Sequence, residues 1–322
     1  MIEKITLIGL GAMGCFFAPR LYECYGEKFR VLANGERKKR LETEGVWVNG
    51  IQYIFPVMDT DVKDPADLII IATKDTGLKQ ALADIKNQVG EHTIIMAVLN
   101  GVESEEKVAA VYGWEHVIYS LMRVSIAMRE GHADFDPASG KVHFGDKEGH
   151  GTGTEFVPGK RVASVAKVFQ KAQIPYVIEE DVLYSMWWKF MANIGENMTC
   201  ALLGIPFGGF RYSEDANWMR HEAMKEVAAI ANAKEIMIGE KEMQIQDSIV
   251  VNIPPNNKPS TLQDLENERK TEIEMFAGTV CRMGRELGIP TPINDMFYHG
   301  IKVLENKYLS MYGDNIGGKQ YE

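Results

Sequence analysis

The chain has no long apolar run and no recognisable export signal. Its longest uninterrupted apolar stretches, such as LIIIA at 68–72, are far shorter than the roughly 18 residues that a membrane-spanning helix requires. The N-terminal stretch MIEKITLIGLGAMG has neither the basic segment nor the cleavage site of a secretory signal. We therefore expect a cytoplasmic protein with no membrane partner.

The chain is also poor in cysteine and has no excess of positive charge. Its 35 Lys and Arg against 45 Asp and Glu give a net charge of −10, which disfavours non-specific binding to nucleic acid. The four cysteines show no C-x-x-C pairing, and the seven histidines show no metal-binding spacing. We expect free thiols that mostly fill the core, no metal site and no nucleic-acid partner.

What the sequence does contain is a glycine motif at its N-terminal end. A short apolar run at 5–8 is followed by GLGAMG and then by a helical pattern. The motif residues are Gly9, Leu10, Gly11, Ala12, Met13 and Gly14. Between a strand and a helix, G-x-G-x-x-G allows a tight turn, close backbone approach to a pyrophosphate, and a helix N-terminus aimed at it. We predict a dinucleotide site, with a plain packing turn as the alternative.

The second predicted strand, KFRVLAN at 28–34, ends at Asn34. An acidic residue there would bind a ribose 2′-hydroxyl and repel a 2′-phosphate. Instead, a basic segment follows that contains Arg37, Lys38, Lys39 and Arg40. These residues either hold a 2′-phosphate or form the solvated start of a helix. We favour NADP (NADPH) over NAD as the cofactor.

Two continuous apolar runs, at 66–74 and 93–101, are typical of central strands covered by helices on both faces. They end in Lys74 and in Asn100, which would lie at the carboxyl ends of the strands, where such sheets bind ligands. A surface lysine and a turn asparagine are the ordinary alternatives. We predict an α/β Rossmann-type doubly wound domain over 1–180.

From about residue 180 onward the periodicity is helical, which predicts an all-α C-terminal domain over 181–322 and a cleft between the two domains. In the predicted helix 183–202, Lys189, Asn193 and Asn197 recur at i, i+4 and i+8. In an α-helix they would lie within about 40° of one another, a polar stripe on an otherwise apolar rod. The stripe is either a buried structural network or the wall of a cavity for a polar ligand.

A second informative helix is predicted over 259–287. Ser260 and Gln263 have the spacing of a capping box, and a hydroxyl at a helix N-terminus can also receive a carboxylate. Glu272 would lie further along the same helix, where a solvated charge is the ordinary interpretation.

Taken together, these segments resemble the ketopantoate reductase (2-dehydropantoate 2-reductase) family over essentially the full length of the chain. The blocks that carry the resemblance are GLGAMG (9–14), ATK (72–74), LNG (99–101), VHFGD (142–146), WWKFMANIGEN (187–197), PSTLQD (259–264), RKTEIEMFAG (269–278) and GIPTPIND (288–295). The family reduces the 2-keto group of ketopantoate with NADPH, which gives pantoate for coenzyme A synthesis.

The resemblance implies roles for individual residues. Lys189 would protonate the carbonyl oxygen, and Glu272 would contact Lys189 and the region of the reacting oxygen, close to the cofactor. The remaining implied contacts are Ser260 with the substrate carboxylate, Asn193 and Asn197 with its hydroxyl and surroundings, and Asn100 and Lys74 with the nicotinamide and phosphate edge, Asn100 also reaching the substrate.

The chain departs from the family pattern at four positions. Asn34 stands where an Arg is usual, Phe207 where relatives can carry Asn, and Met198 where Pro is frequent. Glu196 adds a carboxylate beside the polar stripe. Two alternatives therefore stay open: a related reductase for another 2-keto or 3-hydroxy acid, and a catalytically silent dinucleotide-binding sensor. The sequence is compatible with a homodimer.

Overall fold

The computed structural model describes residues 1–129, 131–146 and 156–308. The chain divides into two compact units, Met1–Leu183 and Tyr184–Glu322. The first unit carries the strands, whereas the described part of the second unit is helical.

The first unit is built on an eight-stranded sheet with the order β12-β11-β8-β7-β6-β1-β2-β5. Neighbouring strands are parallel except for the antiparallel pair β8 and β11. The run from β5 to β8 has the 3-2-1-4-5-6 order of a doubly wound dinucleotide-binding sheet, with its switch point between β1 and β6. The strands are β1 (Ile5–Ile8), β2 (Phe29–Leu32), β5 (Val57–Met58), β6 (Leu68–Ile71), β7 (Ile94–Ala97), β8 (Val117–Arg123), β11 (Lys141–Gly145) and β12 (Tyr176–Ile178). The topology confirms the predicted Rossmann-type fold.

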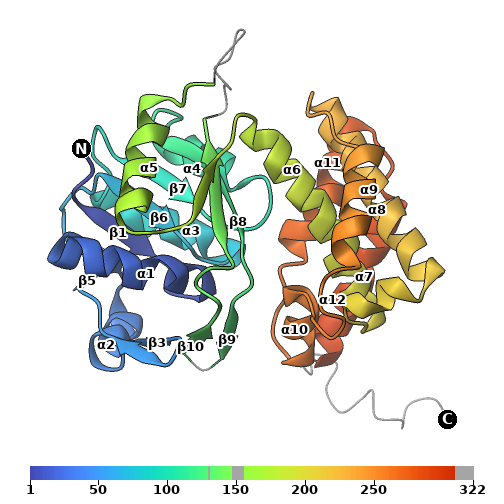
Figure 1. Cartoon of the computed structure of the whole chain (residues 1–322), viewed down its shortest axis with the longest axis horizontal. Helices are drawn as coiled ribbons and strands as arrows, with labels where there is room; N and C mark the ends of the chain where they lie inside the picture. The colour runs from blue at the N-terminus through green and yellow to red at the C-terminus, as the bar shows by residue number, and fades with distance from the viewer. Residues whose placement is uncertain (130, 147–155, 309–322) are drawn as a thin grey trace. The chain divides into compact units, whose positions relative to one another are not determined.

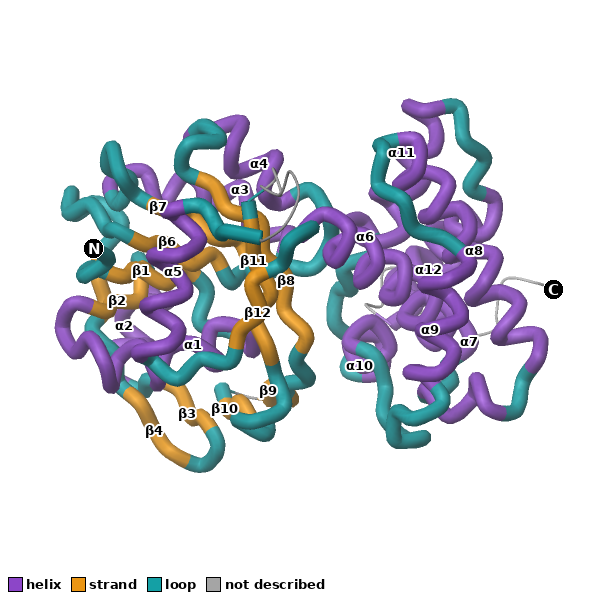
Figure 2. Tube along the Cα trace, turned by 45° about the horizontal axis from the view of Figure 1, so that its top comes forward, coloured by secondary structure: helices purple, strands orange, loops and turns teal. Residues whose placement is uncertain are grey.

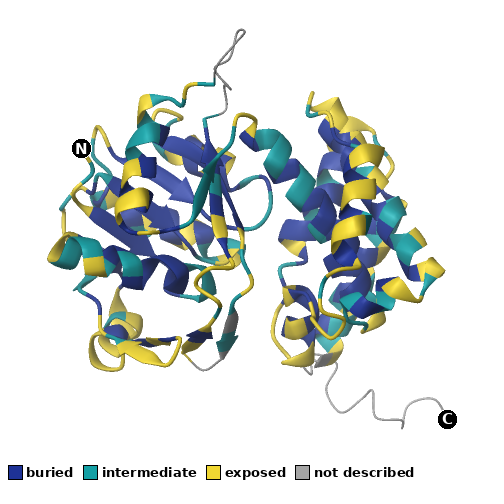
Figure 3. Ribbon diagram, viewed as in Figure 1, coloured by how far each residue is buried: buried dark blue, intermediate teal, exposed yellow. Residues whose placement is uncertain are grey.

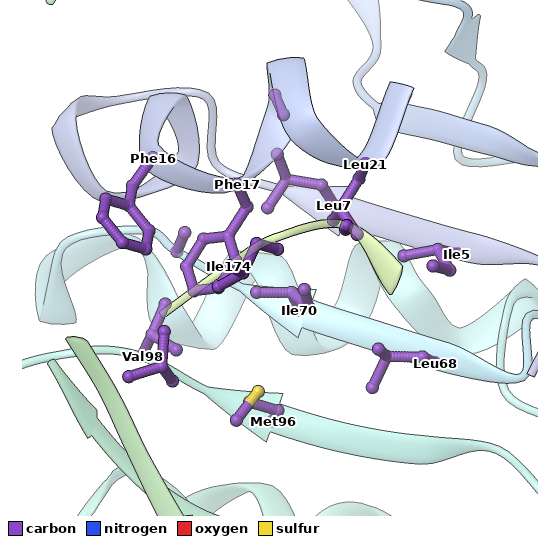
Figure 4. Close-up of a cluster of buried hydrophobic side chains, with 14 of the residues drawn as sticks. Ile5, Leu7, Phe16, Phe17, Leu21, Leu68, Ile70, Met96, Val98 and Ile174 are labelled. Carbon is purple, nitrogen blue, oxygen red and sulfur yellow. The ribbon is translucent and has the colours of Figure 1, made fainter. Parts of the chain in front are cut away.

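Helices cover both faces of this sheet. Side chains alternate across a strand, and in β6 Leu68 and Ile70 join the core beneath α1 (Ala12–Tyr25) and α5 (Lys160–Lys171), as Figure 4 shows for the α1 side. Ile69 and Ile71 join the opposite core, beneath α3 (Asp75–Asp84) and α4 (Ser104–Tyr112). Burial on both faces explains why the central strands are continuous apolar runs, and Figure 3 shows them as buried along their length.

The remaining elements of the first unit are a helix, a second sheet and two 3-10 turns. Helix α2 (Gly35–Thr43) follows β2. A separate four-stranded sheet has the order β4-β3-β10-β9, and Figure 2 shows its strands apart from the large sheet. Its strands are β3 (Val46–Val48), β4 (Ile51–Tyr53), β9 (Ala127–Arg129) and β10 (His132–Asp134), and two 3-10 turns lie at Gly26–Lys28 and Ile85–Asn87.

The second unit is an assembly of helices (Figure 1). Its elements are α6 (Val182–Asn193), a first π-segment (Ile194–Met198), α7 (Thr199–Leu203), a 3-10 turn (Phe207–Arg211), α8 (Glu214–Ala233), α9 (Glu240–Val250), α10 (Ser260–Glu266), a second π-segment (Glu274–Gly278), α11 (Thr279–Leu287) and α12 (Pro292–Tyr308). Within the described ranges of the chain, none of the helices combines the length and apolar character needed to cross a bilayer.

The predicted helix 183–202 is helical throughout but does not stay an α-helix. It changes to π-helical pitch at Ile194, so the α-helical phase that relates Lys189 to Asn193 does not continue to Asn197. Gly195 lies against α8, where an added Cβ would come within 2.6 Å of the Met224 side chain and 2.9 Å of the Arg220 carbonyl oxygen. The α-helical spacing therefore relates Lys189 only to Asn193, and the place of Asn197 in the same stripe stays a prediction.

The prediction of a single continuous helix over 259–287 is wrong, because the structure interrupts it. Helix α10 ends at Glu266, Glu268 has a φ of 54°, and helical structure resumes at Glu274. The capping box does not form, because Pro259 and not Ser260 is the N-cap residue. The side-chain amide of Gln263 instead donates to the carbonyl oxygen of Lys258 at 2.7 Å. Ser260 is thus the first residue of the helix, and capping does not explain it.

The cysteines confirm the expectation drawn from their spacing. All four are free thiols; Cys15, Cys200 and Cys281 are buried and Cys24 is half-buried. Burial raises the pKa of each buried thiol to about 12. They stay protonated at neutral pH and act as small apolar side chains.

Candidate active site

The three glycines of the GLGAMG loop have three different surroundings. Gly9 has a φ of 94°, and an added Cβ would lie 2.6 Å from the backbone of Ala72 and 2.7 Å from the amide nitrogen of Thr73. A Cβ on Gly14 would lie 2.1 Å from the Gly9 carbonyl oxygen, whereas one on Gly11 would meet no atom within 4 Å. Gly9 and Gly14 therefore pack the loop and α1 closely against β1 and β6, and Gly11 leaves an open approach to the backbone.

The N-terminus of α1 fits an anionic group. Gly11 is its N-cap residue, no side chain caps the helix, and its first turn contains no acidic residue. The first-turn amides, including those of Ala12 and Met13, lack partners within the helix and carry the positive end of the helix dipole. Leu10 contributes only backbone to the loop, because its side chain is part of the core. These residues fit the pyrophosphate of a dinucleotide.

Thr73 adds a polar group that sequence reasoning missed. Its hydroxyl is buried and has no hydrogen-bond partner among the residues that the structure describes. It directly follows Ala72, against which Gly9 packs. A buried hydroxyl without a partner is costly unless a bound molecule satisfies it, so Thr73 is a further candidate for cofactor contact.

The loop after β2 carries the residues considered for cofactor choice. Asn34 is exposed, precedes α2 in extended conformation, and donates to the Thr60 hydroxyl at 3.3 Å. Arg37 is exposed in the first turn of α2. Two of the neighbouring cations form ion pairs: Lys38 with Asp59 at 3.2 Å and Lys39 with Glu36 at 2.7 Å. These pairs make Arg37 the stronger candidate for a 2′-phosphate contact.

Lys74 and Asn100 end up at the same edge of the sheet as the glycine loop. Ile8, Ile71 and Ala97 are in register across the adjacent parallel strands β1, β6 and β7, so the segments that follow them emerge side by side. Lys74 is exposed at the N-cap of α3, and Asn100 is half-buried before Gly101, which has a φ of 92°.

A buried carboxyl group follows the Asn100 turn in the chain. Glu105, in the first turn of α4, is fully buried, accepts from the Ser104 hydroxyl at 2.8 Å, and accepts from the backbone amide of Ser120 in β8 at 3.2 Å. Burial raises the pKa of Glu105 to about 7, and these hydrogen bonds only partly oppose that shift. No sequence signal separated it from its acidic neighbours Glu103 and Glu106.

The second unit brings together the elements that carry the other predicted residues. Lys189 and Asn193 are half-buried on α6, and Asn197 is buried in the first π-segment. The two π-segments contact each other, and α10, which begins at Ser260, packs against the first of them. Phe190 stacks on Phe276 with 6.4 Å between ring centroids, which ties α6 to the second π-segment. Glu272 is half-buried and lies two residues before that segment, ahead of its N-cap residue Ile273.

Glu196, the carboxylate expected beside the polar stripe, is buried among partners on α8 and α9. It is 5% exposed, accepts from the Gln246 amide at 2.9 Å, and lies 3.6 Å from Nη1 of Arg220. Burial raises the pKa of Glu196 to about 7, while Gln246 and Arg220 act in the opposite direction. This carboxyl group joins the first π-segment to α8 and α9, so it belongs to the internal packing of the unit.

The other two departures lie in structured surroundings. Met198 is fully buried within the first π-segment. Phe207 is half-buried at the start of a 3-10 turn, and its backbone amide donates to the Asn257 carbonyl oxygen at 3.0 Å.

Comparison with known proteins covers both units. The family model of ketopantoate reductase PanE/ApbA matches residues 5–149, and the model of its C-terminal region matches residues 181–305. The 2-dehydropantoate 2-reductase of Streptococcus pyogenes serotype M18 is 31% identical over 301 residues, which cover 89% of this chain and 93% of that protein. The 2-dehydropantoate 2-reductase of Aquifex aeolicus is 26% identical over 314 residues, with coverages of 95% and 98%.

A solved structure supports the same fold. The ternary structure of D-mandelate dehydrogenase with NADH and anilino(oxo)acetate superimposes with a TM-score of 0.83 at 23% identity, covering 95% of this chain and 99% of that one. The chain therefore belongs to the ketopantoate reductase family and is an NAD(P)-dependent oxidoreductase.

Proposed function

We propose that the protein reduces the 2-keto group of ketopantoate to the hydroxyl group of pantoate, with NADPH as the cofactor, in the route to coenzyme A. The observation that carries the proposal is the set Lys189, Asn193, Asn197, Ser260 and Glu272, which combines a cation, two amides, a hydroxyl and a carboxylate on elements that pack together in the second unit. Family membership over both matched regions supports it.

The chemistry of a 2-keto acid matches this set. When bound, the reduced nicotinamide supplies a hydride to the carbonyl carbon. The ammonium group of Lys189 stabilises the negative charge that develops on the oxygen and donates a proton to it. Such proton donation typically contributes about 10² to 10⁴ in rate. Glu272 holds Lys189 in place through charge, and the Ser260 hydroxyl binds the substrate carboxylate.

The remaining residues divide between substrate and cofactor. Asn193 and Asn197 donate or accept hydrogen bonds at the substrate hydroxyl group. The amides at the start of α1 bind the pyrophosphate, and Lys74 neutralises phosphate charge. Arg37 contacts the 2′-phosphate, a role that its charge and planar donor geometry suit. Asn100 orients the reacting end of the cofactor.

A second substrate class belongs in the test. The structural relative D-mandelate dehydrogenase is named for a 2-hydroxy acid with an aromatic side chain. Phe207 replaces the polar residue that relatives can carry near the substrate, which would suit a more apolar keto acid. This alternative changes the substrate and leaves the role of Lys189 as proposed.

The test is a steady-state assay with ketopantoate and a panel of branched and aromatic 2-keto acids, each with NADPH and NADH. We expect the highest kcat/KM with ketopantoate and NADPH. Arg37→Ala should remove most of the preference for NADPH, whereas Lys39→Ala, at a residue already paired with Glu36, should not. Another keto acid used about tenfold more efficiently would overturn the substrate assignment, and equal kcat/KM values with NADPH and NADH would overturn the cofactor assignment.

A further inference from the structure

A buried carboxylate on α12 holds the turn that precedes Glu272. Glu305 is 3% exposed. Its Oε1 atom accepts two hydrogen bonds from Thr271, one from the backbone amide at 2.7 Å and one from the hydroxyl group at 2.6 Å. Both donors come from a residue that is itself 2% exposed, so these hydrogen bonds form away from water.

Thr271 in turn fixes the chain on both sides of Glu272. Its hydroxyl oxygen accepts from the backbone amide of Ile273 at 3.2 Å. The carbonyl oxygen of Glu272 then accepts from the amides of Met275 and Phe276, both at 3.0 Å, which starts the helical segment. The residues before and after Glu272 are thus tied to one carboxylate through a single threonine.

The far end of the same turn is anchored separately. Arg269 donates from Nε to a carboxylate oxygen of Asp264 at 2.9 Å and from its backbone amide to the Asp264 carbonyl oxygen at 2.8 Å. This closes the segment after α10, which contains Glu268 at a φ of 54°. Between the two anchors the chain has no regular helix to hold it, and the hydrogen bonds of Thr271 fix the backbone on both sides of Glu272.

The second oxygen of Glu305 has a different partner. Its Oε2 atom lies 3.8 Å from the ammonium group of Lys302, which also pairs with Glu274 at 3.0 Å. The charge of Glu305 is therefore compensated on the side away from Thr271. Because both Thr271 donors meet the same oxygen, a neutral amide carbonyl at position 305 keeps an acceptor for both, although a weaker one than the carboxylate.

We propose that Glu305 is a positioning residue, which sets the location of the Glu272 carboxylate by accepting both hydrogen bonds from Thr271. The inference rests on the proposed function only in the role that it gives Glu272. It assigns Glu305 no contact with substrate or cofactor.

Two matched pairs of variants test the proposal in the full-length chain. Glu305→Gln keeps the acceptor oxygen, and Glu305→Met removes it at similar volume. Thr271→Ser keeps the hydroxyl group, and Thr271→Val removes it with the same shape. Each variant is assayed for kcat and for KM with NADPH and the keto acid, and hydrogen exchange at the backbone amides of residues 271 and 273 is measured by NMR.

We expect the Glu305→Gln and Thr271→Ser variants to keep kcat within about threefold of the parent and to protect both amides from exchange. Glu305→Met and Thr271→Val should lose about tenfold or more in kcat with an unchanged KM for NADPH, and the two amides should exchange faster. If Glu305→Met does not fold, the comparison of Thr271→Ser with Thr271→Val tests the proposal by itself.

The outcomes separate the two proposals. Fast exchange of the amides of residues 271 and 273 at a parental kcat would overturn the role of Glu305. Parental exchange rates together with a parental kcat in both Glu305→Met and Thr271→Val would overturn it as well. A parent chain that reduces no 2-keto acid would overturn the proposed function, and the exchange rates would still decide whether Glu305 holds the turn.

Discussion

At the scale of single residues, the surroundings of Gly11 and Gly14 make the glycine loop separable by mutation. Gly14→Ala would place a Cβ 2.1 Å from the Gly9 carbonyl oxygen, so α1 must shift. We expect a loss of about 1–3 kcal/mol in the free energy of unfolding, the usual effect of overpacking. Gly11→Ala meets open space, and we expect nearly parental stability because the weaker N-cap and the stiffer unfolded chain offset each other.

The two variants should differ in cofactor affinity as well. A methyl group on residue 11 would occupy the approach to the helix N-terminus, so Gly11→Ala should weaken NADPH binding by about tenfold or more. Thermal unfolding and calorimetric titration measure the two effects. Gly11→Ala with parental affinity would show that the pyrophosphate does not bind at this loop.

Residue types and spacing were enough to identify the loop, since close backbone contacts require Gly9 and Gly14, and Gly11 leaves the approach to the helix N-terminus open. Glu105, Thr73 and Glu196 were not identifiable in this way. The importance of Glu105 and Glu196 comes from burial against partners distant in sequence, Ser120 and Gln246, whereas Thr73 is distinguished by a buried hydroxyl without a partner among the described residues. An acidic residue in a helix pattern looks the same whether it faces water or a core.

At the scale of elements, the strands were predictable because burial on both faces leaves an unmistakable apolar run, as in β6 and β7. The two long helices were less predictable. Apolar periodicity continues through a π-segment and through the break at 267–273, because both are held by tertiary contacts. Gly195 against α8 and Thr271 against Glu305 are the contacts that matter, and neither is visible in local sequence.

The link between α4 and β8 should make the stability of the first unit depend on pH. The Glu105 carboxyl has a pKa near 4.5 in the unfolded chain and near 7 in the folded protein. Between these values the unfolded state loses its proton while the folded state keeps it, so the free energy of unfolding falls as pH rises through this window. The full effect is about 3 kcal/mol, and it is complete above the folded-state pKa.

Glu105→Gln removes this titration and keeps an acceptor for the Ser120 amide. We expect the variant to lose less stability than the parent between about pH 5 and pH 8, as measured by hydrogen exchange of the β7 and β8 amides. Glu196 lies in the second unit and serves as an internal comparison, since its own pH dependence should persist. An identical pH dependence of β7 and β8 in parent and variant would show that Glu105 does not titrate in this range.

At the scale of the whole molecule, the chain divides its proposed work between two units. Under the proposed function, the first would supply most of the residues for the nucleotide and the second most of those for the keto acid, and the two family models match these regions separately. The resemblance of blocks such as WWKFMANIGEN to the family was sufficient to predict this membership. The choice of keto acid was not predictable, because it depends on the shape of the substrate site, which residue types alone do not define.

The proposed reaction depends on the ammonium group of Lys189 more than on any other group in the chain. Lys189→Ala removes both the charge and the proton, and Lys189→Arg keeps the charge on a group that does not release its proton at neutral pH. Both variants leave the glycine loop and α2 untouched, so NADPH affinity provides the control.

The most direct test is the turnover of Lys189→Ala with ketopantoate at saturating NADPH, measured beside its affinity for NADPH. We predict a kcat reduced by about 10²-fold or more, with nearly parental cofactor affinity. A kcat within about twofold of the parent would contradict the central claim that Lys189 protonates the reacting oxygen.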